Sequence, residues 1–404
     1  MTIFYLIFIL LTAYYSFRYD GIQEYDQHKT HRLWLMCGYL ICLAGFSYGL
    51  GGDKFVYMEE FEQYPTSFSE MGDFIWLQFM MGGKMPLWTI LNMVARVVFN
   101  SFYAVQLAES FAINVAVCYL VSKYTHRYFL FLLVYFFTLK FFVFNTEVMR
   151  EGFAMSFVLV GIHHYLNGKK WLFYLSIPIG LMFHVTALAA IIFPFMRFRI
   201  DWKTLAIAFF ISCAIWFLSD IVLTRVMTAA LGGMGAMVQK VLFYSLQAST
   251  IFGFLRSIIT YLVFPFIIMY SVILLEPSEE LRKRKERMLA YMVVMAVLVS
   301  SFAGFARLYN HVIIFYLIML ADFIYLLFRY KQHLIIRIGT LAGTVLLILL
   351  NYMIYYRTTN TYYYQFFYPY TCILDEDKSV YIREVAHAEA VEAEEKDNNV
   401  RDIK

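Results

Sequence analysis

The stretch from Trp171 to Met196, WLFYLSIPIGLMFHVTALAAIIFPFM, contains no Asp, Glu, Lys or Arg, and His184 is its single histidine. A helix needs about 20 apolar residues to cross the hydrocarbon core of a bilayer, and this stretch is long enough. Ten further apolar runs recur along the 404-residue chain, at roughly 2–17, 33–50, 103–121, 128–145, 152–166, 204–224, 257–275, 288–306, 310–328 and 338–356. Backbone groups in hydrocarbon must be hydrogen-bonded internally, so the runs predict an all-α polytopic integral membrane protein.

The overall composition points the same way. Hydrophobic residues make up 61% of the chain and charged residues only 15%, whereas a soluble globular domain carries about 25% charged residues. The net charge of +4 is small and mostly next to the apolar runs, which indicates positioning in a bilayer and not nucleic-acid binding. The five cysteines have no paired spacing, so we expect neither a metal site nor a disulfide framework.

Basic residues predict which ends of the helices face the cytoplasm. The densest basic block, at 282–287, is placed inside because Lys and Arg are in excess on cytoplasmic loops. Counting outward from it predicts a transmembrane helical domain over residues 1–357, with external segments at about 51–102 and 225–256. Residues 358–404 are then an aromatic and later acidic C-terminal tail on the outside.

The run at 171–196 conflicts with a simple alternation of sides. Lys169 and Lys170 precede it and Arg197 follows it, so both of its ends favour the cytoplasmic side. We therefore favour two short helices that meet near the external side around His184. The alternative is one long span that breaks the charge rule.

The first external segment contains a further apolar stretch at 86–99. Leu87, Leu91, Val94 and Val98 recur at helical spacing, which predicts a helix lying along the outer surface of the membrane. A buried turn of an additional membrane helix is the competing interpretation. The chain as a whole is thus expected to have about 11 to 12 transmembrane helices and one external amphipathic helix.

Three arginines lie at the predicted external ends of spans: Arg150, Arg256 and Arg307. A guanidinium stays charged at any relevant pH and binds phosphate oxygens in a bidentate manner. Several of them converging on one outer cavity would suit a lipid pyrophosphate. Each arginine alone is equally compatible with a structural or lipid-headgroup role, so their convergence is the informative feature.

Two residues are candidates for proton transfer. His184 is an ionisable group inside an apolar run, where such groups usually face a cavity or a partner, although a hydrogen-bonded core histidine is an equal alternative. Asp53 lies in YGLGGDKFVY, Tyr48 to Tyr57, and can act as a general base or a sugar ligand. Tyr57 can stack on a sugar ring, but glycine followed by aspartate is by itself only a turn signal.

The remaining intramembrane charges are few. Glu109 and Lys140 are expected to pair across neighbouring helices, and their number is too small for an ion-coupling pathway. The sequence has no HExxH motif, P-loop or nucleotide-binding fold, so we predict no cofactor and no metal. Without a soluble catalytic domain, any reaction must use a substrate delivered at the membrane.

Four motifs in the chain resemble the EpsG-type family of polysaccharide polymerases, which are related in function to the Wzy-like O-antigen polymerases. They are YGLGGDKFVY, the long stretch that begins NTEVMREGF, FARLYNHVIIFY and FFYPYTCIL, and the resemblance covers about residues 1–374. The chain departs from the family pattern at Tyr48, where many members have arginine, and at Glu147, where glutamine is common. The positions that match are Gly51, Asp53, Tyr57, Arg150 and His184.

The resemblance implies a helical bundle like that of the GT-C glycosyltransferases, in the cytoplasmic (inner) membrane of a bacterium. It also implies a metal-independent glycosyl transfer on the outer face, which builds capsule, exopolysaccharide or O-antigen. Undecaprenyl pyrophosphate on the growing chain would be the leaving group. We assign pyrophosphate binding to Arg150, Arg256 and Arg307, proton transfer to His184 or Asp53, and glycan binding to Tyr57 and Tyr309.

Expected partners are undecaprenyl-pyrophosphate-linked oligosaccharides, membrane lipids, and flippase and chain-length regulator proteins. A flippase for lipid-linked oligosaccharides is an alternative, but it should show internal repeats, and we find none. An O-antigen ligase differs only in its acceptor, so it remains open. A membrane acyltransferase would need a histidine with an acidic partner, which His163 and His164 lack.

Overall fold

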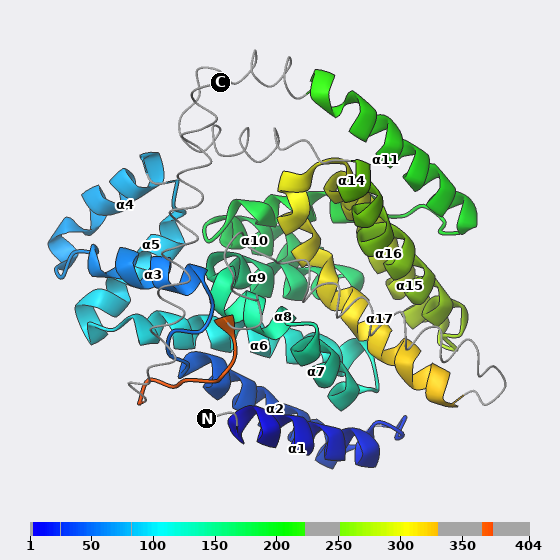
Figure 1. Ribbon diagram of the computed structural model, residues 1–404, viewed down its shortest axis with the longest axis horizontal. Coiled ribbons are helices and arrows are strands. Elements are labelled where there is room, and N and C mark those ends of the chain that lie inside the picture. The colour runs from blue at the N-terminus through cyan, green and yellow to red at the C-terminus, as the bar shows by residue number, and fades with distance from the viewer. Residues whose placement is uncertain (1–2, 25, 82, 223–250, 330–365, 375–404) are drawn as a thin grey trace.

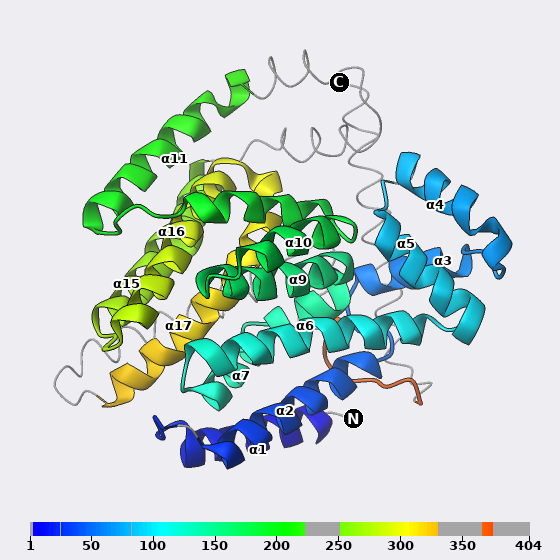
Figure 2. The same cartoon turned by 180° about the vertical axis from the view of Figure 1, so that it is seen from behind.

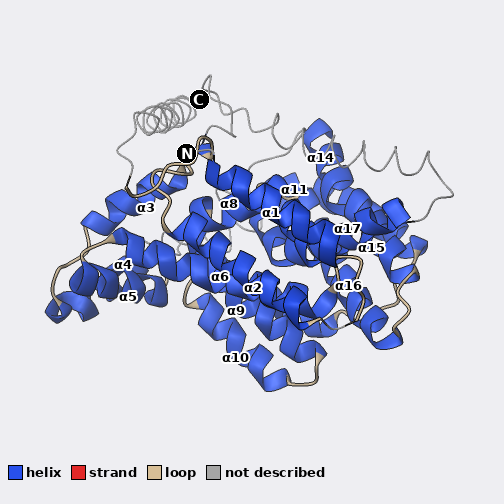
Figure 3. Cartoon of the chain, turned by 90° about the horizontal axis from the view of Figure 1, so that it is seen from below, coloured by secondary structure: helices blue, strands red, loops and turns tan. Residues whose placement is uncertain are grey.

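The computed structural model describes residues 3–24, 26–81, 83–222, 251–329 and 366–374. Helices dominate this part of the chain, and it contains no β-strand (Figure 3). An isolated antiparallel bridge joins Ser47 to Cys372. The prediction of an all-α protein is confirmed for these residues.

The helices follow the hydrophobic runs closely. The α-helices are α1 (Ile3–Tyr19), α2 (Gln27–Gly45), α3 (Asp53–Glu62), α4 (Met71–Met80), α5 (Pro86–Val94), α6 (Phe102–Tyr124), α7 (Tyr128–Phe137), α8 (Lys140–Phe142), α9 (Met149–Leu166), α10 (Lys170–Leu181), α11 (Trp202–Val222), α14 (Ile251–Ser257), α15 (Phe264–Leu274), α16 (Glu279–Ser301) and α17 (Asn310–Arg329). Shorter 3-10 or π elements are η1 (Phe68–Glu70), η2 (Ala95–Phe99), η3 (Val143–Glu147), η4 (Val185–Phe195), η6 (Ile258–Val263) and η7 (Ala303–Tyr309). The predicted run at 338–356 and most of the predicted external segment 225–256 lie outside the described residues.

The helices pack around α6 and α9. Helix α9 contacts α6 and α10, α6 contacts α2, and α17 contacts α7, α15 and α16. Figures 1 and 2 show α3, α4 and α5 gathered at one end of the bundle, with α14 to α17 toward the other end. A Cβ at Gly161 would lie 2.0 Å from Ser176 Oγ, so glycine is what lets α9 and α10 approach closely.

Three of the described helices are long and apolar enough to cross a membrane: Phe102–Tyr124, Ile251–Leu274 and Phe305–Arg329. A fourth is obtained if the bent pair Tyr128–Phe137 and Lys140–Glu147 counts as one span. Apolar helices of this kind support a membrane protein. The larger number of 11 to 12 transmembrane helices remains a prediction.

The run at 128–145, expected as one continuous span, is broken. Leu139 has a left-handed backbone with φ of 59°, and the helices on its two sides are inclined by 78°. The break lies next to Lys140, and a π element follows it and ends at Glu147. Since the left-handed region is unfavourable for residues other than glycine, no local sequence signal announces this bend.

The run at 171–196 forms the hairpin that the basic flanks predicted. Helix α10 ends at Leu181 and η4 begins at Val185, so His184 lies at the turn. The rings of Phe173 and Phe193 are 6.1 Å apart, which brings the two outer ends of the run together. Arg197 donates a hydrogen bond from Nη2 to Tyr165 Oη at 3.1 Å, so the chain returns to the side where α9 ends.

The first segment predicted to be external packs against the tip of this hairpin. The N–H of Leu87 donates to the carbonyl of Met182 at 2.9 Å. The predicted surface helix at 86–99 is present as α5 followed by η2. Trp88 is buried against the bundle, while Val98 remains 58% exposed, so the helix has one inward and one outward face.

Charged groups at the predicted cytoplasmic end are paired. Lys285, from the basic block in the first two turns of α16, lies 2.8 Å from Glu276 and 3.0 Å from Asp322. Asp322 also accepts a hydrogen bond from the hydroxyl of Thr125. A buried ion pair is costly to break because one charge is then left without a partner. This network therefore fixes α16 and α17 to the loop between α6 and α7.

A second buried carboxylate caps α7. Asp20 accepts hydrogen bonds from the N–H groups of Phe129 at 3.3 Å and Leu130 at 2.8 Å. Burial raises the pKa of Asp20 to about 6, and hydrogen bonds from Ser16 and from these two N–H groups oppose the rise. The carboxylate satisfies N–H groups that the first turn of a helix leaves without partners.

The aromatic segment 366–374 returns to the end of α2. The N–H of Ile373 donates to the carbonyl of Phe46 at 3.0 Å, and the N–H of Gly51 donates to the carbonyl of Phe366 at 2.8 Å. The segment therefore runs alongside residues 46–51. The acidic part of the predicted tail lies outside the described residues.

Candidate functional site

Glu147 positions the turn that carries Asp53. Its carboxylate accepts hydrogen bonds from the N–H of Gly52 at 2.6 Å and from the N–H of Asp53 at 3.3 Å. These two residues begin α3, where a negative charge is favoured by the unpaired N–H groups and the helix dipole. Glu147, the departure from the family pattern, is thus a capping residue for α3.

The turn itself fits tightly under η3. Gly51 has φ of +85°, and a Cβ there would lie 2.5 Å from Thr146 Oγ1. Both the left-handed backbone and the close approach require glycine at this position. Asp53 follows at the start of α3, half-buried, and its carboxylate makes no hydrogen bond or ion pair with the described residues.

Arg150 lies in the first turn of α9, three residues after Glu147. Its Cζ atom is 5.7 Å from the centroid of the Tyr57 ring, which is a cation–π distance. Glu60 and Tyr64 are close enough to interact electrostatically with the guanidinium. Within the described residues, the buried Nε atom of Arg150 has no hydrogen-bond partner. A donor is therefore left for a ligand.

Tyr57 supports this arginine and is not exposed to a sugar. Its side chain is 8% exposed and packs edge-on against Trp88, with ring centroids 5.7 Å apart. Burial raises the pKa of Tyr57, and the positive charge of Arg150 opposes the rise. The hydroxyl donates to the carbonyl of Glu147 at 3.4 Å. The ring therefore offers no free face, contrary to the expected stacking role.

His184 lies at the hairpin tip, at the N-terminal end of η4. Its Nδ1 atom is 2.9 Å from Thr186 Oγ1, and no described residue hydrogen-bonds to Nε2. If Nδ1 donates to the hydroxyl, Nε2 can accept a proton; if Nδ1 accepts, Nε2 carries one. The N–H of Thr186 also donates to Nδ1 at 3.4 Å, which favours the tautomer with the proton on Nε2, so a base at Nε2 requires the other tautomer, in which Nδ1 donates to the hydroxyl. Arg150, Arg307 and His311 are close enough to interact electrostatically with the imidazole.

Glu151 connects the start of α9 to the start of α17. Asn310 Nδ2 donates to Glu151 Oε1 at 3.1 Å, and Arg307 and Lys140 are within electrostatic range of the carboxylate. Glu151 is 1% exposed. Arg307 is itself exposed on η7, within electrostatic range of this buried carboxylate.

The structure therefore brings several predicted residues together. Arg150, Arg307 and His184 share one electrostatic neighbourhood, Tyr57 lies beside Arg150, and Asp53 is within electrostatic range of Tyr57. They come from four separate elements: α3, α9, the hairpin tip and η7.

Arg256 and Tyr309 are not joined to this group. Arg256 is exposed on α14, and among the described residues it makes no hydrogen bond or ion pair. Tyr309 is 3% exposed, and its ring packs 4.8 Å from that of Tyr261. A ring buried to this degree cannot stack on a sugar without moving. The structure thus gives no support for a pyrophosphate role of Arg256 or a glycan role of Tyr309.

The expected pairing of Glu109 with Lys140 is wrong. The electrostatic partner of Glu109 is Lys54, and that of Lys140 is Glu151. Glu109 is fully buried on α6, and a Cβ at Gly152 would lie 2.4 Å from its Oε1 atom. Lys140 follows the unpredicted break at Leu139, which explains why sequence spacing misplaced it.

Sequence reasoning missed three members of the cluster: Glu151, Asn310 and His311. His311 is fully buried, and both of its ring nitrogens lack a hydrogen-bond partner in the part of the chain described here. All three lie within four residues of Arg150 or Arg307. A search for polar residues flanking the span-end arginines would have found them.

No cluster of three or more His, Cys, Asp or Glu side chains that could hold a metal ion occurs among the described residues. The family model described as "EpsG family" matches residues 33–372 of this chain. Comparison with curated proteins and with solved structures finds no match.

Proposed function

Because the chain belongs to the EpsG family, which indicates a polymerase role in polysaccharide biosynthesis, we propose that it joins lipid-linked oligosaccharide repeat units on the outer face of the bacterial cytoplasmic membrane. The growing chain would be carried on undecaprenyl pyrophosphate. The observation that supports this most directly is the convergence of Arg150, Arg307 and His184. Two guanidinium groups beside one imidazole match the needs of a departing pyrophosphate and a proton transfer.

The bond changes are those of a glycosyl transfer. A hydroxyl oxygen of the incoming repeat unit attacks the anomeric carbon of the growing chain. The bond from that carbon to the pyrophosphate oxygen breaks, and the lipid pyrophosphate leaves with both electrons. Arg150 and Arg307 neutralise its charge, and the proton of the attacking hydroxyl passes to His184 Nε2 or to the carboxylate of Asp53.

The environment of each group supports its assigned role. Arg150 has a buried Nε donor without a partner in the described structure, and charge-assisted hydrogen bonds to phosphate are strong ones. Arg307 is exposed, so it can reach a lipid headgroup, and it is within electrostatic range of Glu151. Asp53 is fixed by the Glu147 cap and has no ion pair of its own among the described residues.

Complementation of a deletion strain tests the site. We expect Arg150→Ala, Arg307→Ala and His184→Ala each to abolish long polymer, whereas Arg256→Ala retains it. The last variant is a matched control because it removes an exposed arginine outside the cluster. Long polymer at wild-type levels with both Arg150→Ala and His184→Ala would show that the site is wrong.

Two rival functions have distinct outcomes in the same strain. A polymerase defect leaves single lipid-linked repeat units on the outer face of the membrane. A flippase defect leaves them on the inner face, and a ligase defect leaves long polymer on the lipid carrier. Glycosidase accessibility of the accumulated glycan in spheroplasts, together with its length on a gel, distinguishes the three.

A further inference from the structure

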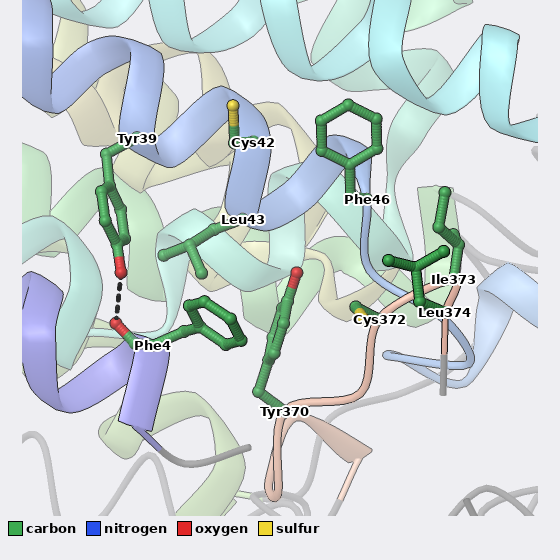
Figure 4. Close-up of a pocket in the computed structure, with 9 residues that line it drawn as sticks. All are labelled: Phe4, Tyr39, Cys42, Leu43, Phe46, Tyr370, Cys372, Ile373 and Leu374. Atoms are coloured by element: carbon green, nitrogen blue, oxygen red, sulfur yellow. Dashed lines mark hydrogen bonds between the residues drawn. The ribbon is translucent and has the colours of Figure 1, made fainter. Parts of the chain in front are cut away.

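A groove lies where the end of α2, the start of α1 and the segment 370–374 meet (Figure 4). Its volume of about 430 Å³ is within the range of about 300–1,000 Å³ for small-molecule sites. Aromatic and aliphatic side chains line it. The hydroxyl of Tyr39 donates to the carbonyl of Phe4 at 2.9 Å, so this polar atom of the wall is satisfied within the wall itself.

Three of the side chains that line the groove are exposed at its opening. They are Phe4, which is 39% exposed, Phe46, which is 41% exposed, and Cys42. An apolar surface of this kind is unfavourable in water and is favourably covered by hydrocarbon. The chemistry of the walls therefore selects a hydrocarbon chain as the occupant.

The wall of the groove continues into the candidate site. Segment 370–374 runs beside residues 46–51, with the N–H of Tyr48 donating to the carbonyl of Thr371 at 2.9 Å. The next residues, Gly52 and Asp53, contact Glu147. Since a chain spans at most about 3.6 Å per residue, the five steps from Phe46 to Gly51 cover at most about 18 Å.

We propose that this groove binds the first isoprenoid units of the polyprenyl chain whose pyrophosphate is held at Arg150. The inference rests on the proposed function and assigns the substrate's lipid to a specific surface. The continuous wall between the groove and the Asp53 turn favours a chain that is attached to the reacting headgroup over a bulk phospholipid. The aromatic wall, with the Phe4 and Tyr370 rings 5.6 Å apart, suits a methyl-branched, unsaturated chain.

The inference is tested by filling the groove with a larger side chain. Cys42→Trp places a large ring in the groove, and Leu35→Trp is the matched control. Leu35 lies seven residues earlier on the same face of α2, is 52% exposed and does not line the groove. Purified variants are assayed with two donors that carry the same oligosaccharide pyrophosphate, one on a long polyprenyl chain and one with a methyl group in place of that chain.

We expect Cys42→Trp to raise KM for the long-chain donor at least tenfold relative to Leu35→Trp, with kcat for the methyl donor, which has no isoprene unit to place in the groove, equal in both. Equal KM values in the two variants would overturn the inference. They would overturn it also if Cys42→Trp lost copurifying phospholipid, because the groove would then bind phospholipid and not the substrate's chain. Failure of the proposed function is distinguishable, because the wild-type protein would then turn over neither donor.

A second measurement covers the case in which Cys42→Trp does not fold. A polyprenyl pyrophosphate with a photoreactive diazirine on its first isoprene unit is applied to the wild-type protein in detergent. We expect crosslinks within residues 39–46 or 370–374. Crosslinks confined to other segments would contradict the assignment.

Discussion

Substitution of Gly51 tests whether the turn before α3 is held as tightly as the structure indicates. A Cβ at this position would lie 2.5 Å from Thr146 Oγ1 and 2.6 Å from Thr146 Cβ. The threonine cannot simply rotate away, because its hydroxyl donates to the carbonyl of Phe142 at 2.8 Å. In Gly51→Ala the turn itself must therefore move away from η3.

The expected loss of stability has two parts. An L-residue in the left-handed conformation costs about 1–2 kcal/mol. Overpacking adds about 1–3 kcal/mol, which gives about 2–5 kcal/mol for Gly51→Ala. Gly83→Ala is the control, because Gly83 has φ of +60° and nothing lies within 4 Å of its Cβ position. That variant should lose only the backbone part, about 1–2 kcal/mol.

Thermal unfolding of the purified proteins in detergent and polymer length in a complemented deletion strain are the two assays. We expect Gly51→Ala to melt below Gly83→Ala and to lose long polymer, because moving the turn displaces Asp53 and breaks its contact with Glu147. A displacement of about 1 Å can lower a rate about 100-fold. Equal melting temperatures and equal polymer in the two variants would refute the close packing of this turn.

Three further predictions concern the capping and paired carboxylates. Glu147→Ala should shorten polymer and lower the melting temperature more than Glu147→Gln, which keeps one acceptor for Gly52; identical behaviour would contradict the cap. Asp322→Asn should lower the melting temperature by leaving Lys285 with Glu276 alone, and an unchanged value would show that the pair contributes nothing. Because burial raises the pKa of Asp20 to about 6 in the folded protein, this residue's contribution to stability is largest near pH 4 and decreases as pH rises through 6. Asp20→Asn should therefore flatten the dependence of melting temperature on pH between 4 and 7, and an unaltered slope would count against the raised pKa.

The helices were predictable from the sequence because backbone N–H and C=O groups in hydrocarbon must be hydrogen-bonded within the protein, and a helix achieves this within one segment. The hairpin at 171–196 was also predictable, since basic residues on both of its sides could not be reconciled with one crossing. The break at Leu139 was not, because a left-handed residue in an apolar run has no local signature. With the break missed, the partner of Lys140 was assigned incorrectly.

The candidate site was predictable only in part. Span-end arginines and an intramembrane histidine are visible as local exceptions, so Arg150, Arg307 and His184 could be selected. The contact between Glu147 and Gly52 joins residues 95 positions apart, and no single-sequence pattern encodes it. The burial of Tyr57 and Tyr309 depends on the packing of other helices, so the sequence could not show that both rings are largely enclosed.

The two polar regions of the protein differ in how their buried groups are satisfied. At the predicted cytoplasmic end, Lys285 has two carboxylates within 3.0 Å. In the cluster around Arg150 and Arg307, Arg150 Nε, Glu151 Oε2 and both nitrogens of His311 are buried without partners in the described structure. Each such atom costs about 1–3 kcal/mol. Packing alone does not explain why several unsatisfied buried groups lie close together. A site that binds an anion and moves a proton does explain it. The unsatisfied groups beside Arg150 and Arg307 therefore support the proposal that this cluster binds a ligand.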